Sequence, residues 1–154
     1  MRQHSRFALV AAGVLALAAL GVPQAGVAAE PGSREAIDQA AAVNTELALA
    51  YMREGNLKAA REKIDKALQQ DARTANTQMA AGFVYDKLGD KKKALSHFEQ
   101  AVKLGGKDNP DVVANAAVYF CMNGEPKRGE QYMLQAAASP LNARPDVAYT
   151  NAGR

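Results

Sequence analysis

The sequence predicts an all-α fold, an α-solenoid of three helical hairpins plus the start of a fourth. Hydrophobic residues make up 48% of the 154 residues, aromatic residues make up 6%, and tryptophan is absent. This alanine-rich composition favours closely packed helices over a β-sandwich. Three glycines, Gly55, Gly89 and Gly124, recur at intervals of 34 and 35 residues. Residues of the same class recur at fixed distances around each glycine, which indicates a repeated structural unit.

The first 29 residues have the layout of a secretory signal peptide. Two arginines precede an uncharged, almost entirely apolar run over 7–20. A proline and small residues follow, which predicts cleavage between Ala29 and Glu30. The apolar run is shorter than the roughly 20 residues that span a bilayer. A retained N-terminal anchor is the alternative.

The charge of the remaining chain is close to neutral. Without residues 1–29 it keeps 17 basic and 16 acidic residues, a formal charge of +1. A protein this close to neutrality has no strong electrostatic attraction to DNA or to anionic lipid. The scarcity of aromatic residues also argues against single-stranded nucleic-acid binding, which depends on base stacking. The expected partner is therefore not a nucleic acid.

Helix start and stop signals divide the chain into elements. Ser33 is a candidate cap for a helix that begins near Arg34. The run "NPD" at 109–111 starts the first helix of repeat three, and Pro126 suits the first turn of its second helix. The predicted boundaries are a leader and helix start over 30–40, repeats over about 41–74, 75–109 and 110–143, and a partial fourth repeat over 146–154, within an expected repeat domain at 41–154.

Each recurring position has a packing role. The glycine ends the first helix in a left-handed conformation. The aromatic residue four positions earlier fills the wedge between the helices, and small residues let their backbones approach closely. Gly129 replaces the alanine of the other repeats at a cost of about 1 kcal/mol in helix propensity, and still closer packing is the one reason we find for it. The positions assigned to repeat packing are Ala48, Tyr51, Gly55, Ala60 and Ala67, then Gly82, Tyr85, Gly89, Ala94 and Ala101, then Ala117, Phe120, Gly124 and Ala136.

The pattern "LAxxYxxxGxxxxAxxxIxxAL" and its two further copies resemble the tetratricopeptide repeat, a 34-residue helix–turn–helix unit. The resemblance covers about 100 consecutive residues and implies a right-handed superhelix whose first helices line a concave groove. Unrelated amphipathic helices are the alternative, but such helices need not share one period.

Registering the first helices on the three aromatic positions predicts which residues line that groove. The surface is largely apolar and includes three methionines, whose flexible side chains adapt to irregular partners. It therefore predicts a binding site for a peptide or protein. The alternative is that some of these residues pack between repeats. The predicted groove residues are Thr45, Leu49 and Met52, then Met79, Phe83 and Asp86, then Ala114, Asn115, Val118 and Met122.

The stretch "YFCMNG…YMLQAAASPL…P…AYTNAG" resembles the PilW/PilF family of type IV pilus biogenesis and stability proteins, over roughly 35–154. The resemblance implies a periplasm-facing scaffold that helps the outer-membrane secretin to assemble and supports pilus stability. The implied partner is the secretin or another pilus assembly protein. Many members carry a lipid-bearing cysteine directly after the apolar run, and this chain has none there. A soluble periplasmic form is therefore expected, with outer-membrane association left open. Ala116 and Ala117 also replace the asparagine-tyrosine-glycine stretch usual in relatives.

The end of the chain bears on its single cysteine, Cys121. The run "YTNAG" at 149–153 matches the opening of a fourth repeat, and Arg154 follows it. We expect a fragment, because a terminal repeat needs a capping helix. Relatives often carry a second cysteine just after "NAG", so the resemblance implies a disulfide between Cys121 and a cysteine beyond the chain end. A small buried packing residue is the other interpretation.

No catalytic constellation is present in the sequence. His97 is the one histidine after residue 29, and it lies in a different repeat from Cys121. A nucleophilic site needs a base and an orienting partner, and a metal site needs clustered ligands. We therefore expect no enzyme activity, cofactor or metal. Two alternatives remain: another cell-envelope adaptor, or the leading repeats of a longer chain with a catalytic domain.

Overall fold

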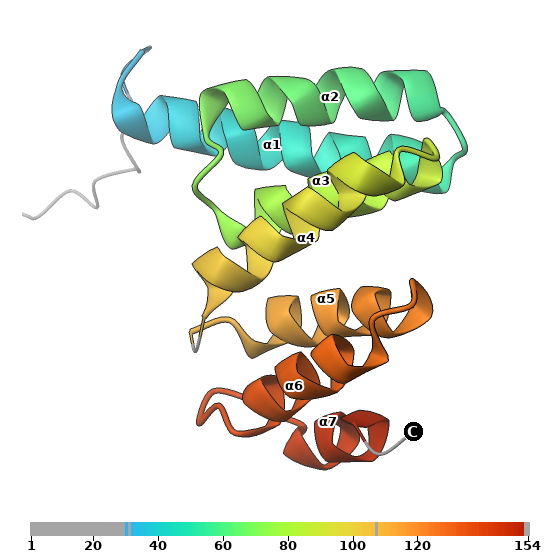
Figure 1. The fold of residues 1–154 in the computed structure, drawn as a ribbon. Coiled ribbons are helices and arrows are strands. Elements are labelled where there is room, and N and C mark those ends of the chain that lie inside the picture. Colours follow the sequence, from blue (N-terminus) through green and yellow to red (C-terminus); the bar gives the residue numbers. More distant parts are fainter. Residues whose placement is uncertain (1–29, 31, 107, 153–154) are drawn as a thin grey trace, which may run out of the picture.

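The computed structural model describes residues 30, 32–106 and 108–152, and this part of the chain contains helices and no strand. The signal peptide predicted over 1–29 lies outside the described residues. The helices, shown in Figure 1, are α1 (Arg34–Arg53), α2 (Leu57–Gln70), α3 (Ala75–Lys87), α4 (Lys91–Gly105), α5 (Pro110–Met122), α6 (Pro126–Ala137) and α7 (Pro145–Ala152).

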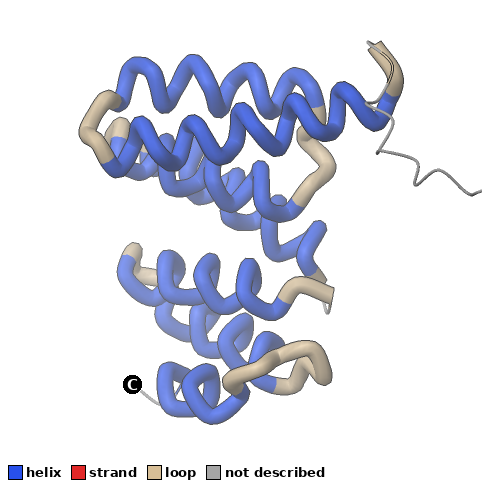
Figure 2. Tube along the Cα trace, turned by 180° about the vertical axis from the view of Figure 1, so that it is seen from behind, coloured by secondary structure: helices blue, strands red, loops and turns tan. Residues whose placement is uncertain are grey.

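The helices pack as consecutive pairs. The pairs α1–α2, α3–α4 and α5–α6 are hairpins that follow one another down the molecule, and α7 lies against α6 (Figures 1 and 2). The first helices also contact each other, α1 against α3 and α3 against α5. The predicted solenoid of three hairpins plus the start of a fourth is therefore confirmed.

The three hairpin turns are built alike. Gly55, Gly89 and Gly124 have φ angles of 78°, 80° and 89°, the left-handed conformation that glycine adopts without steric cost. The backbone N–H that follows each glycine donates to the carbonyl of an aromatic residue five positions earlier, which closes a Schellman turn. The accepting residues and N···O distances are Tyr51 at 2.9 Å, Tyr85 at 2.9 Å and Phe120 at 3.0 Å.

The residue after each glycine also begins the next helix. The side chains of Asn56 and Asp90 cap α2 and α4 by accepting backbone N–H groups at 3.2 Å and 3.1 Å. Glu125 makes no such bond, and Pro126 in the first turn of α6 supplies the preset φ angle instead. At the start of α1, Ser33 accepts the Ala36 N–H at 3.1 Å, as the sequence predicted.

The core consists of small residues at the helix crossings and larger side chains between them. Phe98 of α4 is fully buried, meets Phe83 of α3 edge-on at 5.1 Å and stacks on Tyr119 of α5 at 4.1 Å between ring centroids. Aromatic contacts thus join the second hairpin to the third. The small side chains assigned to packing are all at most 1% exposed: Ala48, Ala60, Ala67, Ala94, Ala101, Ala117 and Ala136.

Gly129 and Cys121 lie at the crossing of α5 and α6. A Cβ added to Gly129 would overlap Cys121 Sγ and would lie 2.7 Å from the Ala117 carbonyl oxygen. The glycine is therefore present because the two backbones approach more closely here than at Ala60 or Ala94. Cys121 itself is exposed, so the interpretation that it is a small buried packing residue is wrong.

Candidate binding groove

The first helices of the hairpins share one face that is hollowed by three cavities. The α1–α3 cavity has a volume of about 230 Å³, the α3–α5 cavity about 260 Å³ and the α5–α7 cavity about 170 Å³. Asn115 and Val118 line both of the last two cavities, so these two are continuous across α5. We call the surface that lines the three cavities the groove face.

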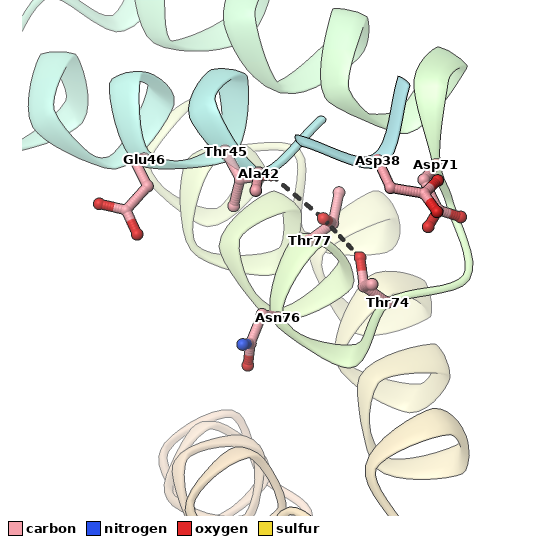
Figure 3. Close-up of a pocket in the computed structure, with 8 residues that line it drawn as sticks. All are labelled: Asp38, Ala42, Thr45, Glu46, Asp71, Thr74, Asn76 and Thr77. Carbon is pink, nitrogen blue, oxygen red and sulfur yellow. Dashed lines mark hydrogen bonds between the residues drawn. The ribbon is translucent and has the colours of Figure 1, made fainter. Parts of the chain in front are cut away.

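Hydroxyl groups hold α1 and α3 together at the α1–α3 cavity (Figure 3). Thr45 Oγ1 donates to the Ala41 carbonyl at 2.8 Å, and Thr74 Oγ1 donates to Thr77 Oγ1 at 2.7 Å. Thr77 therefore donates to Thr45 Oγ1 across the two helices, at 3.1 Å. Each hydroxyl proton has an acceptor, so this contact satisfies the buried polar atoms of Thr45 and Thr77.

Carboxylates surround these hydroxyls. The Asp71 side chain is 6% exposed and accepts the backbone N–H and the Nε of Arg73 at 2.9 Å and 3.0 Å. Asp38 lies 2.9 Å from the Nε of Arg34. Glu46 is exposed on α1 and makes no ion pair with any residue that the structure describes.

The α3–α5 cavity is lined by larger apolar side chains than the α1–α3 cavity. Phe83 lies at its α3 side, and Val118 and Met122 of α5 are 43% and 80% exposed. Lys91 and Asp86 form an ion pair at its rim, with Nζ and Oδ1 2.5 Å apart. The hydrogen bond to Asp86 raises the pKa of Lys91.

The α5–α7 cavity combines polar and apolar groups. Asp111 lines it from the first turn of α5 and makes no ion pair within the described ranges. Arg144 lines the opposite side, with its Nε 3.5 Å from Asp146. Ala148 of α7 is buried against α5 and α6, so the start of the fourth hairpin forms one side of this cavity.

The structure brings together part of the predicted groove. The α3–α5 cavity is lined by Phe83, Asp86, Asn115, Val118 and Met122. Thr45 and Ala114 line the two outer cavities. The remaining three residues are half-buried and pack against the core, which is the alternative that the sequence left open: Leu49, Met52 and Met79.

Sequence reasoning predicted Asp86 but missed the other carboxylates of the groove face, which are Asp38, Glu46, Asp71 and Asp111. Asp38, Ala42 and Glu46 lie four residues apart on α1, so they form one stripe of a helix. This spacing could have revealed them, but the predicted register placed Thr45 rather than Glu46 in the groove and did not extend back to Asp38. Asp71 comes from the loop between α2 and α3, and no helical period predicts its position.

His97 has a structural environment. Its Nδ1 lies 2.8 Å from Gln78 Oε1, and its ring stacks on Tyr85 with centroids 5.3 Å apart. Burial lowers the pKa of His97. It is half-buried between α3 and α4 rather than the surface or edge residue that the sequence suggested. Cys121 lies at the crossing with α6, where its Sγ is 4.0 Å from the Pro126 carbonyl oxygen. His97 contacts Gln78 and Tyr85, so these contacts do not join the two residues as a nucleophile and its base.

The described residues hold neither a metal-binding cluster nor a helix of membrane-spanning character. No group of three or more histidine, cysteine, aspartate or glutamate residues in 30, 32–106 and 108–152 is arranged to hold a metal ion. Among the helices that the structure describes, none has the length and apolar character needed to cross a bilayer.

Comparison with known proteins agrees with the fold. Residues 39–105 match the family model of the tetratricopeptide repeat. An uncharacterized protein of Haemophilus influenzae is 32% identical over 101 residues, which cover 66% of this chain and 56% of that protein. The segment that matches the family model includes the hairpin α3–α4 and all of the hairpin α1–α2 except the first residues of α1.

Solved structures match a larger share of the chain than the family model does. PilW, a widely conserved type IV pilus biogenesis factor, has 27% identity and a TM-score of 0.66 over 75% of this chain and 52% of that chain. Pseudomonas aeruginosa pilF has 23% identity and a TM-score of 0.68 over 77% and 53%. The N-terminal domain of Caenorhabditis elegans stress-induced protein-1 shares the fold, with 16% identity and a TM-score of 0.59 over 77% and 98%. The chain thus spans about half the length of PilW and pilF, and the resemblance to them predicted from the sequence is confirmed.

Proposed function

We propose that this tetratricopeptide-repeat protein is a periplasmic scaffold in type IV pilus biogenesis, which assists assembly of the outer-membrane secretin and supports pilus stability. The observation that carries the proposal is the match to PilW, a type IV pilus biogenesis factor, at 27% identity over 75% of the chain. The proposed role is non-catalytic, and no cofactor is required for it.

The groove face supplies the binding surface that this role requires. Val118 and Met122 project from α5 near the half-buried Phe83 of α3, and the side chains of Val118 and Met122 are open to solvent. An exposed apolar surface between rigid helices favours docking of a peptide segment, because burial of that surface stabilises the complex. The hairpin stack holds these side chains on separate helices, so they are preorganised for a partner.

Export is the second component of the proposal. The basic start, the apolar run over 7–20 and the small residues before Glu30 support a secretory signal. A fusion of residues 1–29 to alkaline phosphatase tests it, since this enzyme folds only where disulfides form. We expect phosphatase activity from the fusion and none when two apolar residues of 7–20 are replaced by arginine. An inactive fusion would contradict a periplasmic location.

Complementation in a piliated source strain tests the pilus role. Deletion of the gene is expected to reduce the detergent-resistant secretin multimer and surface pili, and the wild-type gene to restore both. The variant V118D/M122D should fail to restore them, because two charges enter the exposed apolar part of the groove face.

The matched control is L104D/L134D. Leu104 and Leu134 are 42% and 43% exposed and lie on the second helices α4 and α6, away from the groove face. This control should restore the secretin multimer as the wild type does. Normal multimers and pili in the deletion strain would contradict the pilus role and favour a different cell-envelope adaptor or the repeat region of a larger enzyme.

A further inference from the structure

The groove face differs in charge from the rest of the protein. Without residues 1–29 the chain has a formal charge of +1. The charged side chains that line the three cavities are mostly acidic, with two cations against five carboxylates. The cations are Lys91 and Arg144, and the carboxylates are Asp38, Glu46, Asp71, Asp86 and Asp111.

Both cations already form ion pairs within the protein. Lys91 pairs with Asp86 at 2.5 Å and Arg144 pairs with Asp146 at 3.5 Å. A carboxylate of a partner would have to compete with these intramolecular pairs. The groove face therefore offers an acidic partner no unpaired cation among its lining residues.

Two of the carboxylates form no such ion pair. Glu46 and Asp111 are both exposed, and neither forms an ion pair with any residue in the described part of the chain. They line the two outer cavities, on either side of the α3–α5 cavity. Charges at the rim of a binding site steer and select partners of opposite sign.

The two unpaired carboxylates and the apolar side chains follow one another along the solenoid. Glu46 lies on α1, the apolar side chains of Phe83, Val118 and Met122 lie on α3 and α5, and Asp111 lines the α5–α7 cavity. A segment that follows the groove face would meet a carboxylate, then an apolar surface, then a carboxylate. A segment that complements this order would carry a bulky apolar side chain with basic residues on both sides of it.

We infer that the partner of the groove face is a basic polypeptide segment, in which lysine or arginine residues flank at least one large apolar residue. The inference rests on the proposed function of the groove as a peptide-binding site, and it adds the chemistry of the segment. The basic residues pair with Glu46 and Asp111, and the apolar residue packs against Val118 and Met122.

A phage library of random dodecapeptides tests the sign of the partner's charge and needs no identified partner protein. The library is panned on the wild-type protein after depletion on the uncharged variant V118N/M122N, so the recovered peptides depend on the apolar part of the groove face and are not selected by an added charge. We expect recovered peptides to carry a mean net charge of about +2 or more, with an aromatic or large aliphatic residue between the basic positions.

Charge-neutral variants then test the two carboxylates. A synthetic copy of the most enriched peptide is titrated by fluorescence anisotropy against wild type, E46Q/D111N and the control E62Q/E130Q. Glu62 and Glu130 are exposed on the second helices α2 and α6. We expect about fivefold weaker binding to E46Q/D111N in low salt, since each exposed ion pair contributes a fraction of 1 kcal/mol. The control should change binding less than twofold, and the difference should shrink in about 0.5 M salt.

The outcomes separate the inference from the proposed function. Failure to recover any peptide that depends on Val118 and Met122 would overturn the groove as a peptide site. Recovery of groove-dependent peptides that are neutral or acidic would overturn the basic partner and leave the groove standing. Equal binding by E46Q/D111N and wild type would likewise overturn the assigned role of the two carboxylates.

Discussion

The substitution G129A should destabilise the protein, although helix propensity and the other repeats both favour alanine at this position. The first two repeats carry Ala60 and Ala94 here, each fully buried. In the third repeat a Cβ would lie 2.7 Å from the Ala117 carbonyl oxygen and 2.9 Å from the Cys121 nitrogen. Both are backbone atoms of α5, so rotation of a side chain cannot relieve these two contacts.

The size of the effect follows from two opposing contributions. Alanine in place of glycine stabilises a helix by about 1 kcal/mol. Overpacking of a close crossing costs about 3 kcal/mol at the upper end of the usual range, because α6 must move away from α5 by several tenths of an ångström. The net expectation is a loss of about 2 kcal/mol in the free energy of unfolding.

Urea unfolding followed by circular dichroism at 222 nm measures this loss. The double variant C121A/G129A removes the sulfur that the new methyl group would overlap but keeps the contact with the Ala117 carbonyl. It should therefore recover only part of the stability. The matched control A94G should lose about 1 kcal/mol or more, since it removes a buried methyl group and helix propensity together.

An increase or no change in stability for G129A would refute the reasoning. That result would mean that α5 and α6 are farther apart than the structure has them, or that α6 shifts without cost. Full recovery in C121A/G129A would instead assign the whole effect to the cysteine sulfur and remove the backbone contact from the explanation.

Three further substitutions test the packing. G82A should lower the urea midpoint, because the added Cβ would lie 2.9 Å from three ring atoms of the fully buried Phe98; a higher midpoint would show that the ring yields freely. Y85F should lose about 1.5 kcal/mol with the 2.5 Å hydrogen bond to Asp65. Burial and this bond raise the Tyr85 pKa from 10.0 to about 12, so its contribution is complete below pH 10 and disappears towards pH 12. The gap between wild type and Y85F should therefore narrow over that interval, and a constant gap would contradict the shift. R128M should lose about 1 kcal/mol, because its ion pairs at 2.8 Å and 3.0 Å and its aromatic contact at 4.3 Å are removed; an unchanged midpoint would show that they contribute nothing.

The regular part of the fold could be predicted because each repeat solves the same packing problem with the same residue classes. Gly55, Gly89 and Gly124 must take positive φ values to end their helices, and this requirement is visible in the sequence as a period. The small residues at the crossings are similarly constrained, since a larger side chain would separate the helices. The residue types at these positions are therefore constrained in the same way in every repeat, and the sequence alone reveals them as a period.

The site was harder to predict because its chemistry depends on contacts between repeats. Thr45 was assigned to the groove by register, and the structure shows that its hydroxyl also bridges to Thr77, thirty-two positions later. Asp71 reaches the same cavity from a loop, where no period applies. The reason for Gly129 depends on the separation of α5 and α6, and helix separation is not encoded in the spacing of one residue.

Leu49 and Met79 illustrate the limit of a helical register. Both lie on first helices at positions that could face the groove, and both pack against the core as half-buried residues. A helical register shows which residues share one face of a helix. It does not give the angle between successive hairpins, and that angle decides how much of each side chain the next hairpin covers.

The central claim is that the first helices present one continuous face that holds a polypeptide segment. Titration of the 15N-labelled protein with the most enriched library peptide, followed by heteronuclear NMR, tests it most directly. The account predicts that perturbed amides map to α1, α3 and α5 around Glu46, Phe83 and Val118, the residues that line the three cavities. Perturbations confined to α2, α4 and α6 would contradict it.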